Sequence, residues 1–434
     1  MHDRSSKPAE RGAALVLFSI MLLLVVLPMV GLAIDGGVAY FAHARLVSAS
    51  DAAALAGARS LNIGLDFTAQ KQNAESIAKQ YFYANYPAGY LNTKNVTITA
   101  DAEETGTHVR TVSVSVGADV SMYFLGLLGH QTTHIATSAQ TSRRDVNVVL
   151  TLDRSGSMSR VCGTMKAAAK SFVTKFTNGR DTMGLITFMG NANVDEKSTV
   201  NFNPSLSNAL DSLVCSGNTG SAAALYLAHT QITSVAEPGA LNVIVFFTDG
   251  VPNGFSSSGF PVQSSSSCNG GKPLAGFISD SGGIFSLTPV AIDKPNIQPT
   301  ACSGNMSYLA KNFQYIPDTD AYGNSAWSTG YRPVQRDIQN NIVFSSANSD
   351  AVSANAADDA ARQIRDKGIF IYTIGLDGNG GLDSVLLKRI ANDPSVGSAY
   401  QPSQPTGMYA YAGNAGQLAA AFNSIASEVL RISQ

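Results

Sequence analysis

A long apolar segment near the N-terminus constrains the topology of this chain of 434 residues. Residues 13–34, AALVLFSIMLLLVVLPMVGLAI, contain no charged side chain. A helix of this length crosses the hydrocarbon core of a bilayer, at about 1.5 Å per residue. Basic residues precede the segment and an acidic one follows it, so the positive-inside rule predicts a cytoplasmic N-terminus and a periplasmic or extracellular remainder. We expect a retained single-pass anchor; a cleaved signal peptide is the alternative, although the segment is longer than a usual signal-peptide core.

Composition excludes one class of partner and indicates a compartment. Charged residues make up only 14% of the chain, and the formal net charge is −2. Because no basic stripe is available to neutralise phosphates, nucleic acid is not expected as a partner. The four cysteines are widely spaced and form no C-x-x-C motif. Their even number predicts two disulfides in an oxidising compartment; four buried thiols are the alternative.

The periodicity of apolar residues changes twice along the chain. Residues 1–61 hold a cytoplasmic stub, the anchor and an alanine-rich helix that extends beyond the anchor. Residues 62–142 combine a helical pattern with alternating stretches such as NVTITADA, which predicts a small α+β domain. In residues 143–434, short apolar stretches alternate with helical patterns. This order predicts an α/β domain with a doubly wound, mostly parallel, Rossmann-like sheet and helices on both faces.

The first 61 residues carry several features of one bacterial family. The segment ERGAALVLFSIMLL is followed by GLAIDGGVAYFAHARLVSASDAAALAGA. This pattern resembles the N-terminal anchor of Flp pilus-assembly TadE/TadG-like proteins, on Arg11, Gly12, Asp35, Gly36 and the run 51–56. The resemblance implies a bacterial protein of the inner (cytoplasmic) membrane, whose partners are pilus or envelope components. An unrelated single-pass anchor followed by an alanine-rich helix is the alternative.

Polar residues follow two of the predicted buried strands. DRSGSM comes directly after VVLTL and supplies Asp153, Ser155 and Ser157, and the stretch LNVIVFFTDG supplies Asp249. Between them, NTGSAAAL opens a predicted helix and supplies Thr219. Ligands of parallel sheets bind at the carboxyl ends of the strands, so we expect these side chains to meet there. Two carboxylates and three hydroxyls are hard oxygen ligands, which suit Mg²⁺ or Mn²⁺.

The order of these motifs carries a second resemblance. D-x-S-x-S, a separate threonine and a strand ending in T-D-G are similar to the metal-ion-dependent adhesion site of von Willebrand factor type A domains, over about Asp145 to Ser433. The resemblance implies serine hydroxyls that contact a divalent cation directly, and aspartates that often act through water or hydrogen bonds. The cation then binds an aspartate or glutamate of a protein partner. A polar turn that caps a helix is the alternative explanation of DRSGSM.

Together these features predict a membrane-anchored, metal-dependent adhesion or assembly protein of a Tad/Flp-type pilus system. A surface adhesin or minor pilin that contacts host or neighbouring cells is the alternative. A metal-assisted hydrolase is the third hypothesis, but His229 is the only histidine after His134, and no G-x-S-x-G motif occurs. We therefore expect that the protein is not an enzyme.

An insertion of about 100 residues, 254–353, interrupts the predicted sheet after TDGVPN. Aromatic residues and two cysteines are scattered through this serine- and glycine-rich stretch, which predicts an ordered, loop-rich excursion. Because it leaves the sheet beside Asp249, we expect it to form a wall or lid of the binding surface. Surface decoration is the alternative.

The cysteines divide between the metal end of the predicted sheet and the insertion. Cys162 lies early in the helix after DRSGSM, and Cys215 lies just before Thr219. We expect a Cys162–Cys215 bridge that fixes the Thr219 loop, and a Cys268–Cys302 bridge within the insertion. Four cysteines allow three pairings, so the connectivity stays a hypothesis.

Overall fold

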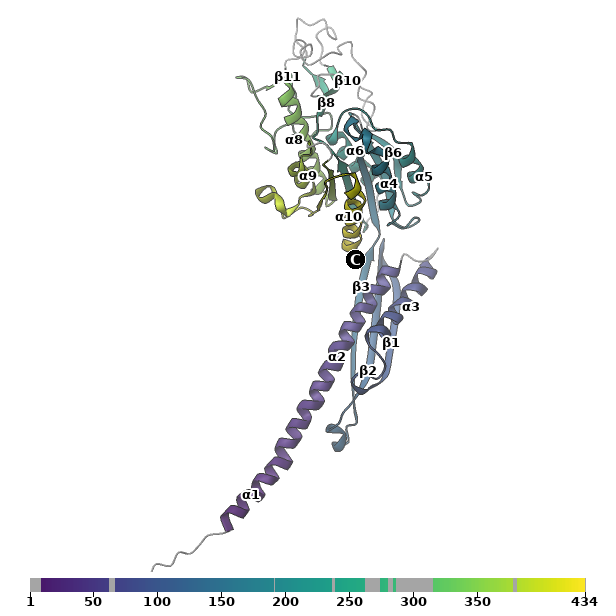
Figure 1. The fold of residues 1–434 in the computed structure, drawn as a ribbon, viewed down its shortest axis with the longest axis vertical. Helices are drawn as coiled ribbons and strands as arrows, with labels where there is room; N and C mark the ends of the chain where they lie inside the picture. Colours follow the sequence, from purple (N-terminus) through teal and green to yellow (C-terminus); the bar gives the residue numbers. More distant parts are fainter. Residues whose placement is uncertain are drawn as a thin grey trace, which may run out of the picture. The chain divides into compact units, whose positions relative to one another are not determined.

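The computed structural model divides at Asp145 into two compact units, each described here by itself. We call them the N-terminal unit, up to Arg144, and the C-terminal unit, Asp145–Ser433. Their elements are labelled in Figure 1. The residues that the structure describes are 9–61, 67–190, 192–235, 239–261, 274–279, 284–285, 315–377 and 381–433.

The N-terminal unit begins with a nearly continuous helix (Figure 1). Its parts are α1 (Ala9–Met21), the π-helical turn η1 (Leu22–Val26) and α2 (Leu27–Ser60). Pro28 follows η1, and its missing N–H interrupts the regular hydrogen-bond ladder there. Large apolar side chains are exposed along this helix from Leu15 to Ile34, and the exposed Tyr40 and Phe41 follow. Among the described residues, this is the one helix long and apolar enough to cross a membrane, by length and composition.

An antiparallel sheet with the strand order β1–β2–β3 packs against α2 and α3. Val112 and Val114 of the central strand share one core with Ala42 and Leu46 of α2. The sequence pattern separates the extended helix from the strands at residue 61, but the structure joins both into a single core. The remaining elements of this unit are α3 (Phe67–Asn85), η2 (Tyr90–Asn92), β1 (Thr93–Gly106), β2 (Val109–Ser121), η3 (Leu125–Leu128) and β3 (Thr132–Arg144).

The C-terminal unit is built on a six-stranded sheet with the order β14–β13–β7–β4–β5–β6. Neighbouring strands are parallel except β6, which runs antiparallel to β5 at one edge. The predicted α/β fold with a mostly parallel sheet is confirmed. The strands are β4 (Val146–Asp153), β5 (Thr182–Phe188), β6 (Ala192–Thr199), β7 (Leu241–Thr248), β13 (Phe370–Leu376) and β14 (Tyr409–Ala412).

Helices cover both faces of this sheet because successive strand residues point to opposite sides. Val148 and Leu150 of β4 belong to one core, and Val149 between them belongs to the other. The first face is covered by α4 (Cys162–Val173), α5 (Ser205–Ser212) and α10 (Leu418–Ile432). The second face is covered by α6 (Ser221–Val235), α8 (Ser346–Arg365) and α9 (Ser384–Ala391). Short 3₁₀ turns are η4 (Gly156–Arg160), η6 (Pro394–Ala399) and η7 (Ala415–Gln417).

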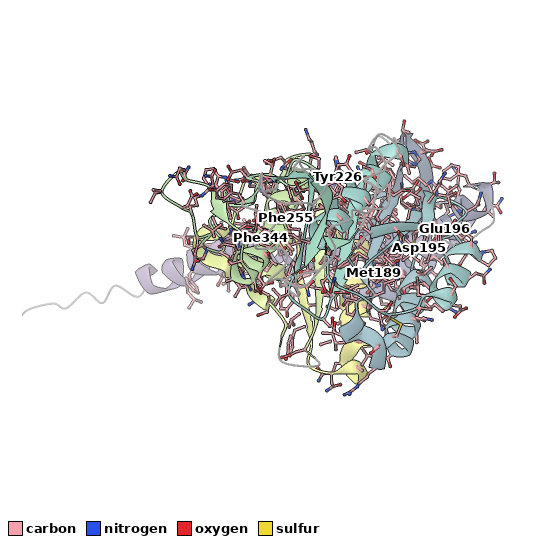
Figure 2. The ribbon with its side chains drawn as sticks, turned by 90° about the horizontal axis from the view of Figure 1, so that it is seen from above. Met189, Asp195, Glu196, Tyr226, Phe255 and Phe344 are labelled. Carbon is pink, nitrogen blue, oxygen red and sulfur yellow. A yellow bond between two sulfur atoms is a disulfide. The ribbon has the colours of Figure 1, made fainter. Side chains whose placement is uncertain are left out.

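The described part of the insertion packs in a small apolar cluster that also includes Ala222 of α6 and Ala356 of α8. Phe255 and Phe344 lie close together in Figure 2 and pack with Ile278, Ile316 and Val352. The strands here are β8 (Gly254–Phe260), β9 (Leu274–Ser279), β10 (Ile284–Phe285), β11 (Tyr315–Ile316) and β12 (Ile342–Val343). The predicted Cys268–Cys302 bridge lies outside the described residues.

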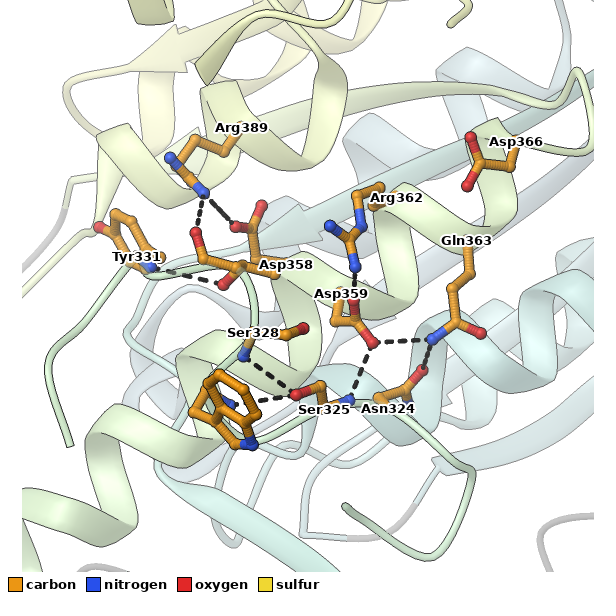
Figure 3. A network of polar contacts seen from close by, with 12 residues as sticks. Asn324, Ser325, Ser328, Tyr331, Asp358, Asp359, Arg362, Gln363, Asp366 and Arg389 are labelled. Atoms are coloured by element: carbon orange, nitrogen blue, oxygen red, sulfur yellow. Dashed lines mark hydrogen bonds and ion pairs between the residues drawn. The ribbon is translucent and has the colours of Figure 1, made fainter. Parts of the chain in front are cut away.

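Buried polar contacts fasten the end of the insertion to α8 (Figure 3). The Asp359 carboxylate accepts hydrogen bonds from the Ser325 backbone N–H and the Gln363 side chain, each at 2.8 Å. The α8 helix already begins at Ser346, inside the stretch assigned to the insertion, because the Ser345 side chain caps it. The first turns of α8, up to residue 353, therefore belong to a helix of the α/β domain and not to a loop of the insertion.

Candidate metal centre

Asp153 is the last residue of β4, at the carboxyl edge of the sheet. Leu152 pairs with Phe247 of β7, so Asp153 lies beside Thr248 at the end of that strand. Both oxygens of the buried Asp153 carboxylate accept hydrogen bonds. Oδ1 accepts from the backbone N–H of Ser155 at 2.7 Å, and Oδ2 accepts from the Thr248 hydroxyl at 2.5 Å. The orientation of this carboxylate is therefore fixed from two sides.

A chain of polar contacts joins the DRSGSM turn to the end of β7. The hydroxyl oxygens of Ser155 and Ser157 are 3.0 Å apart, and the Ser157 hydroxyl donates to Oδ1 of Asp249 at 2.7 Å. Asp249 directly follows β7, which is the sheet neighbour of β4. Adjacent parallel strands thus bring together four of the five predicted residues, although Asp249 lies far from Asp153 along the chain.

Thr219, the fifth predicted residue, lies in the loop before α6 and is buried. Its backbone N–H donates to Oδ1 of Asn253 at 2.8 Å, and its carbonyl accepts from the Asn253 N–H at 3.1 Å. The same loop contacts the DRSGSM turn, since the Gly156 N–H donates to the Gly217 carbonyl at 2.8 Å. Within the described residues, the Thr219 hydroxyl makes no hydrogen bond to the other four. Thr219 is therefore held beside the turn by backbone contacts.

A disulfide fixes the Thr219 loop from the other side. Cys162 at the start of α4 is bonded to Cys215, and their Cα atoms are 6.1 Å apart. This is the first of the two bridges expected from the sequence. It ties the residues just after the DRSGSM turn to those just before Thr219.

Two carboxylates, those of Asp153 and Asp249, share this edge of the sheet. Burial raises the pKa of Asp153 to about 7; its hydrogen bonds from Ser155 and Thr248 lower the pKa, and the nearby Asp249 carboxylate raises it further. Burial also raises the pKa of Asp249, against the effect of the Ser157 hydrogen bond. In the part of the chain that the structure describes, no lysine or arginine forms an ion pair with either group. A bound cation would compensate both negative charges.

The donor set fits a hard divalent cation. Its atoms are carboxylate and hydroxyl oxygens, which Mg²⁺ and Mn²⁺ prefer over the nitrogen and sulfur ligands typical of zinc. The described ranges contain no group of three or more His, Cys, Asp or Glu side chains that could hold a metal. A cation here would depend on the serine and threonine hydroxyls as well as on the two aspartates.

His229, the histidine that a hydrolase would require, lies at a different place. It is on α6 and lines a cavity of about 160 Å³ together with Tyr226, Tyr322 and Lys367. None of the five predicted site residues lines that cavity. His229 therefore does not form a base for Ser155 or Ser157.

Two residues that position the site are absent from the predicted set. Thr248 holds Asp153, and Asn253 holds the Thr219 loop: its side-chain Oδ1 accepts from the Thr219 N–H, and its backbone N–H donates to the Thr219 carbonyl. Thr248 could have been predicted from the sequence, because it directly precedes Asp249 in the T-D-G motif. Asn253 carries no such signal, because only the folded loops bring it to Thr219.

Two family models match the chain. Residues 148–251 match the von Willebrand factor type A domain, and residues 12–60 match the putative Flp pilus-assembly TadE/G-like family. The first match contains all five predicted site residues, and the second contains the apolar segment and Asp35. No curated protein matches the chain.

Several solved structures are similar to this chain at low identity. The pilus adhesin SpaC from Lactobacillus rhamnosus GG is 16% identical, with a TM-score of 0.41 over 78% of this chain and 35% of SpaC. The vWF domain of the type V pili tip protein Mfa5 from Porphyromonas gingivalis is 19% identical, with a TM-score of 0.40 over 67% of this chain and 97% of that domain. The PilB minor pilin from Streptococcus sanguinis is 15% identical, with a TM-score of 0.39 over 79% of this chain and 80% of PilB. This chain spans about a third of the length of SpaC, so such likenesses say nothing about its activity.

The two family matches agree with the two units of the structure. The TadE/G-like match covers the apolar helix of the N-terminal unit, as in a membrane-anchored protein. The other match covers the strands and loops that carry the candidate centre. The chain therefore carries a von Willebrand factor type A domain behind a TadE/G-like N-terminal segment.

Proposed function

We propose that this chain is an inner-membrane-anchored, metal-dependent protein-binding component of a Tad/Flp-type pilus system. The observation that carries the proposal is the contact chain from Ser155 through Ser157 to Asp249. A divalent cation, Mg²⁺ or Mn²⁺, would be held by five residues: Asp153, Ser155, Ser157, Thr219 and Asp249. The TadE/G-like match supports a role in pilus assembly, and the apolar helix supports the anchor.

The chemistry of the site favours binding of an anionic protein group. When bound, the cation supplies a positive charge that an aspartate or glutamate of a partner can coordinate. Hydroxyl ligands are neutral, so they leave more of that charge available than carboxylate ligands would. Both oxygens of Asp153 already accept hydrogen bonds from the protein, which orients this carboxylate next to the serine hydroxyls. The residues therefore hold and orient, and no bond of the partner is broken.

The insertion is proposed to form a wall of the binding surface. It begins directly after Asn253, the residue that contacts Thr219. Phe277 of β9 packs over Gly190 and Gly254, where a Cβ on Gly254 would overlap the Phe277 ring at 1.7 Å. Gly190 follows Met189 (labelled in Figure 2), whose carbonyl accepts from the Gly220 N–H at 2.6 Å. The described part of the insertion thus lies against the loops that flank Thr219.

Metal binding is tested directly with the detergent-solubilised full chain and Mn²⁺. Electron paramagnetic resonance and calorimetry should detect one bound Mn²⁺ in the wild type and none in Asp249→Asn. The matched control is Asp211→Asn, which removes an exposed carboxylate of the same unit that pairs with Lys170. Equal binding by Asp249→Asn and the wild type would refute the site.

Partner binding is tested by capture of pilus and envelope proteins in Mg²⁺ and in EDTA. We expect capture by the wild type in Mg²⁺ only, and no capture by Asp153→Ala although its fold survives. Equal capture in EDTA would defeat the mechanism. Cell fractionation and shearing then distinguish the roles: retention in the membrane fraction supports an assembly component, and release with sheared fibres supports the adhesin or minor pilin alternative.

A further inference from the structure

The connection between β2 and β3 in the N-terminal unit carries an exposed apolar tip. Residues 122–129, MYFLGLLG, contain no charged side chain. Leu127 is 84% exposed and Leu128 is 74% exposed, and the aromatic rings of Tyr123 and Phe124 are exposed as well. Contiguous large apolar side chains on a surface mark a site for a protein or membrane contact.

The tip is fastened to the anchor helix by Asp35. Oδ1 of Asp35 accepts the backbone N–H of Tyr123 at 2.9 Å, and Oδ2 accepts those of Phe124 and Leu125 at 2.9 and 2.8 Å. These N–H groups open the η3 turn, where a helix has no internal partners for them. Asp35 therefore caps η3 from α2, although the two segments are far apart in the chain.

Along α2, the tip extends beyond Asp35 and lies beside the end of the apolar segment, residues 13–34. The Phe124 ring covers Gly31, and a Cβ on Gly31 would lie 2.4 Å from Phe124 Cγ. Gly31 lies one helical turn before Asp35, about 6 Å nearer to the middle of the apolar segment. Any membrane that covers residues 13–34 therefore also meets Phe124.

Asp35 does not give this part of the surface a polar character. Its side chain is only 1% exposed, and its charge is directed at three N–H groups. The exposed side chains around it on α2 are apolar or aromatic, namely Leu32, Ile34, Tyr40 and Phe41. Tyr40 and Phe41 of α2, like Tyr123 and Phe124 of the tip, are exposed aromatic residues, a type enriched at membrane–water interfaces.

We propose that the tip, residues 123–128, inserts into the lipid interface beside the anchor as a second membrane contact. The proposal rests on the proposed membrane anchoring. Continuity with the apolar helix and the absence of charge favour lipid over a protein as the occupant. Two contacts with one leaflet restrict the tilt and rotation of the anchor, so they hold the N-terminal unit in one orientation to the membrane.

Depth-dependent fluorescence quenching of the full chain in vesicles tests this contact. Trp327, the only tryptophan, is first replaced by phenylalanine, and Leu127→Trp, Leu23→Trp and Ile338→Trp are then made separately. Leu23 lies within the apolar segment, and Ile338 is an exposed apolar residue of the C-terminal unit. The vesicles contain phosphatidylethanolamine and phosphatidylglycerol, with a nitroxide-labelled phosphatidylcholine as quencher.

We expect the nitroxide-labelled lipid to remove about half or more of the emission of Leu127→Trp, and the emission of Ile338→Trp to stay unchanged. Adding Gly31→Leu, which displaces Phe124, should restore emission at position 127 and leave quenching at position 23. Quenching at position 23 without quenching at position 127 would overturn the tip contact and leave the anchor intact. Quenching at neither position would overturn both. Unchanged quenching at position 127 with Gly31→Leu would overturn the role of α2 in docking the tip.

Discussion

Two buried aspartates, one in each unit, show how differently a protein can treat the same side chain. Asp35 and Asp153 both follow an apolar run, and both are almost fully buried. Three backbone N–H groups point at Asp35, which ties η3 to α2. Asp153 has one N–H and one hydroxyl and lies near the second carboxylate of Asp249. The first charge is balanced by the protein, whereas the second favours an external cation.

The largest expected effect comes from removing the disulfide, a crosslink that the C-terminal unit has and that the N-terminal unit, which contains no cysteine, cannot form. All four cysteines belong to the C-terminal unit. Replacing Cys162 and Cys215 by serine opens a crosslink between residues 53 positions apart, which should lower the free energy of unfolding of that unit by about 4 kcal/mol. Denaturant unfolding followed by Trp327 fluorescence measures the loss. Amide exchange of residues 122–129 should not change, and faster exchange there would contradict the independence of the two regions.

The next effect concerns the capping of η3. Asp35→Ala leaves three N–H groups without their acceptor, which should cost about 3 kcal/mol locally and speed amide exchange of residues 123–125 about 100-fold. Hydrogen exchange with mass spectrometry measures it, with and without Mg²⁺. Asp51→Ala, at an exposed position of the same helix, is the control and should leave the rates unchanged. If the exchange rates of residues 123–125 change with Mg²⁺, the capping of η3 by Asp35 depends on the cation, which would contradict this comparison of the two aspartates.

Cation binding should stabilise only the unit that contains Asp153. At a Mg²⁺ concentration about 100 times the dissociation constant, the free energy of unfolding of the C-terminal unit should rise by about 2.7 kcal/mol. Asp249→Asn should abolish the gain, and Asp211→Asn should retain it. Thermal unfolding with Mg²⁺ and with EDTA makes the measurement. A gain in Asp249→Asn equal to that of the wild type would place the cation elsewhere.

The smallest expected effect is a pH dependence in EDTA. The pKa of Asp153 is about 7 when folded and near its ordinary 3.8 when unfolded, so the unfolded state holds fewer protons between these values. Stability should therefore fall as pH rises, by about 1 kcal/mol from about pH 6 to about pH 8. Asp153→Asn should remove most of this slope, measured by denaturant unfolding at each pH. A steeper or unchanged slope in Asp153→Asn would assign it to another group.

Part of this architecture could be read from local patterns. Buried parallel strands are apolar throughout, as in VVLTL and LNVIVFF, and the helices between them show their own period, so the α/β fold was predictable. The same strands end in Asp153 and Asp249, and strand ends of a parallel sheet share one edge, so their approach could also be inferred. The start of α8 at Ser346 could not, because serine and asparagine are as common in loops as at helix caps.

Contacts between distant segments were beyond such patterns. The sequence places a charge at Asp35 and so predicts the end of the apolar surface there, but the folded η3 turn covers that charge. In the same way, Thr248 and Asn253 gain their roles only from the strand and loop that fold against them.

By itself, the sequence determined the kind of each element and the residue types at the ends of the strands, because periodicity and side-chain chemistry are local properties. Only the tertiary structure decided which polar groups meet. Hydrogen bonds depend on distances of about 3 Å, and such distances between remote segments exist only after the chain has folded.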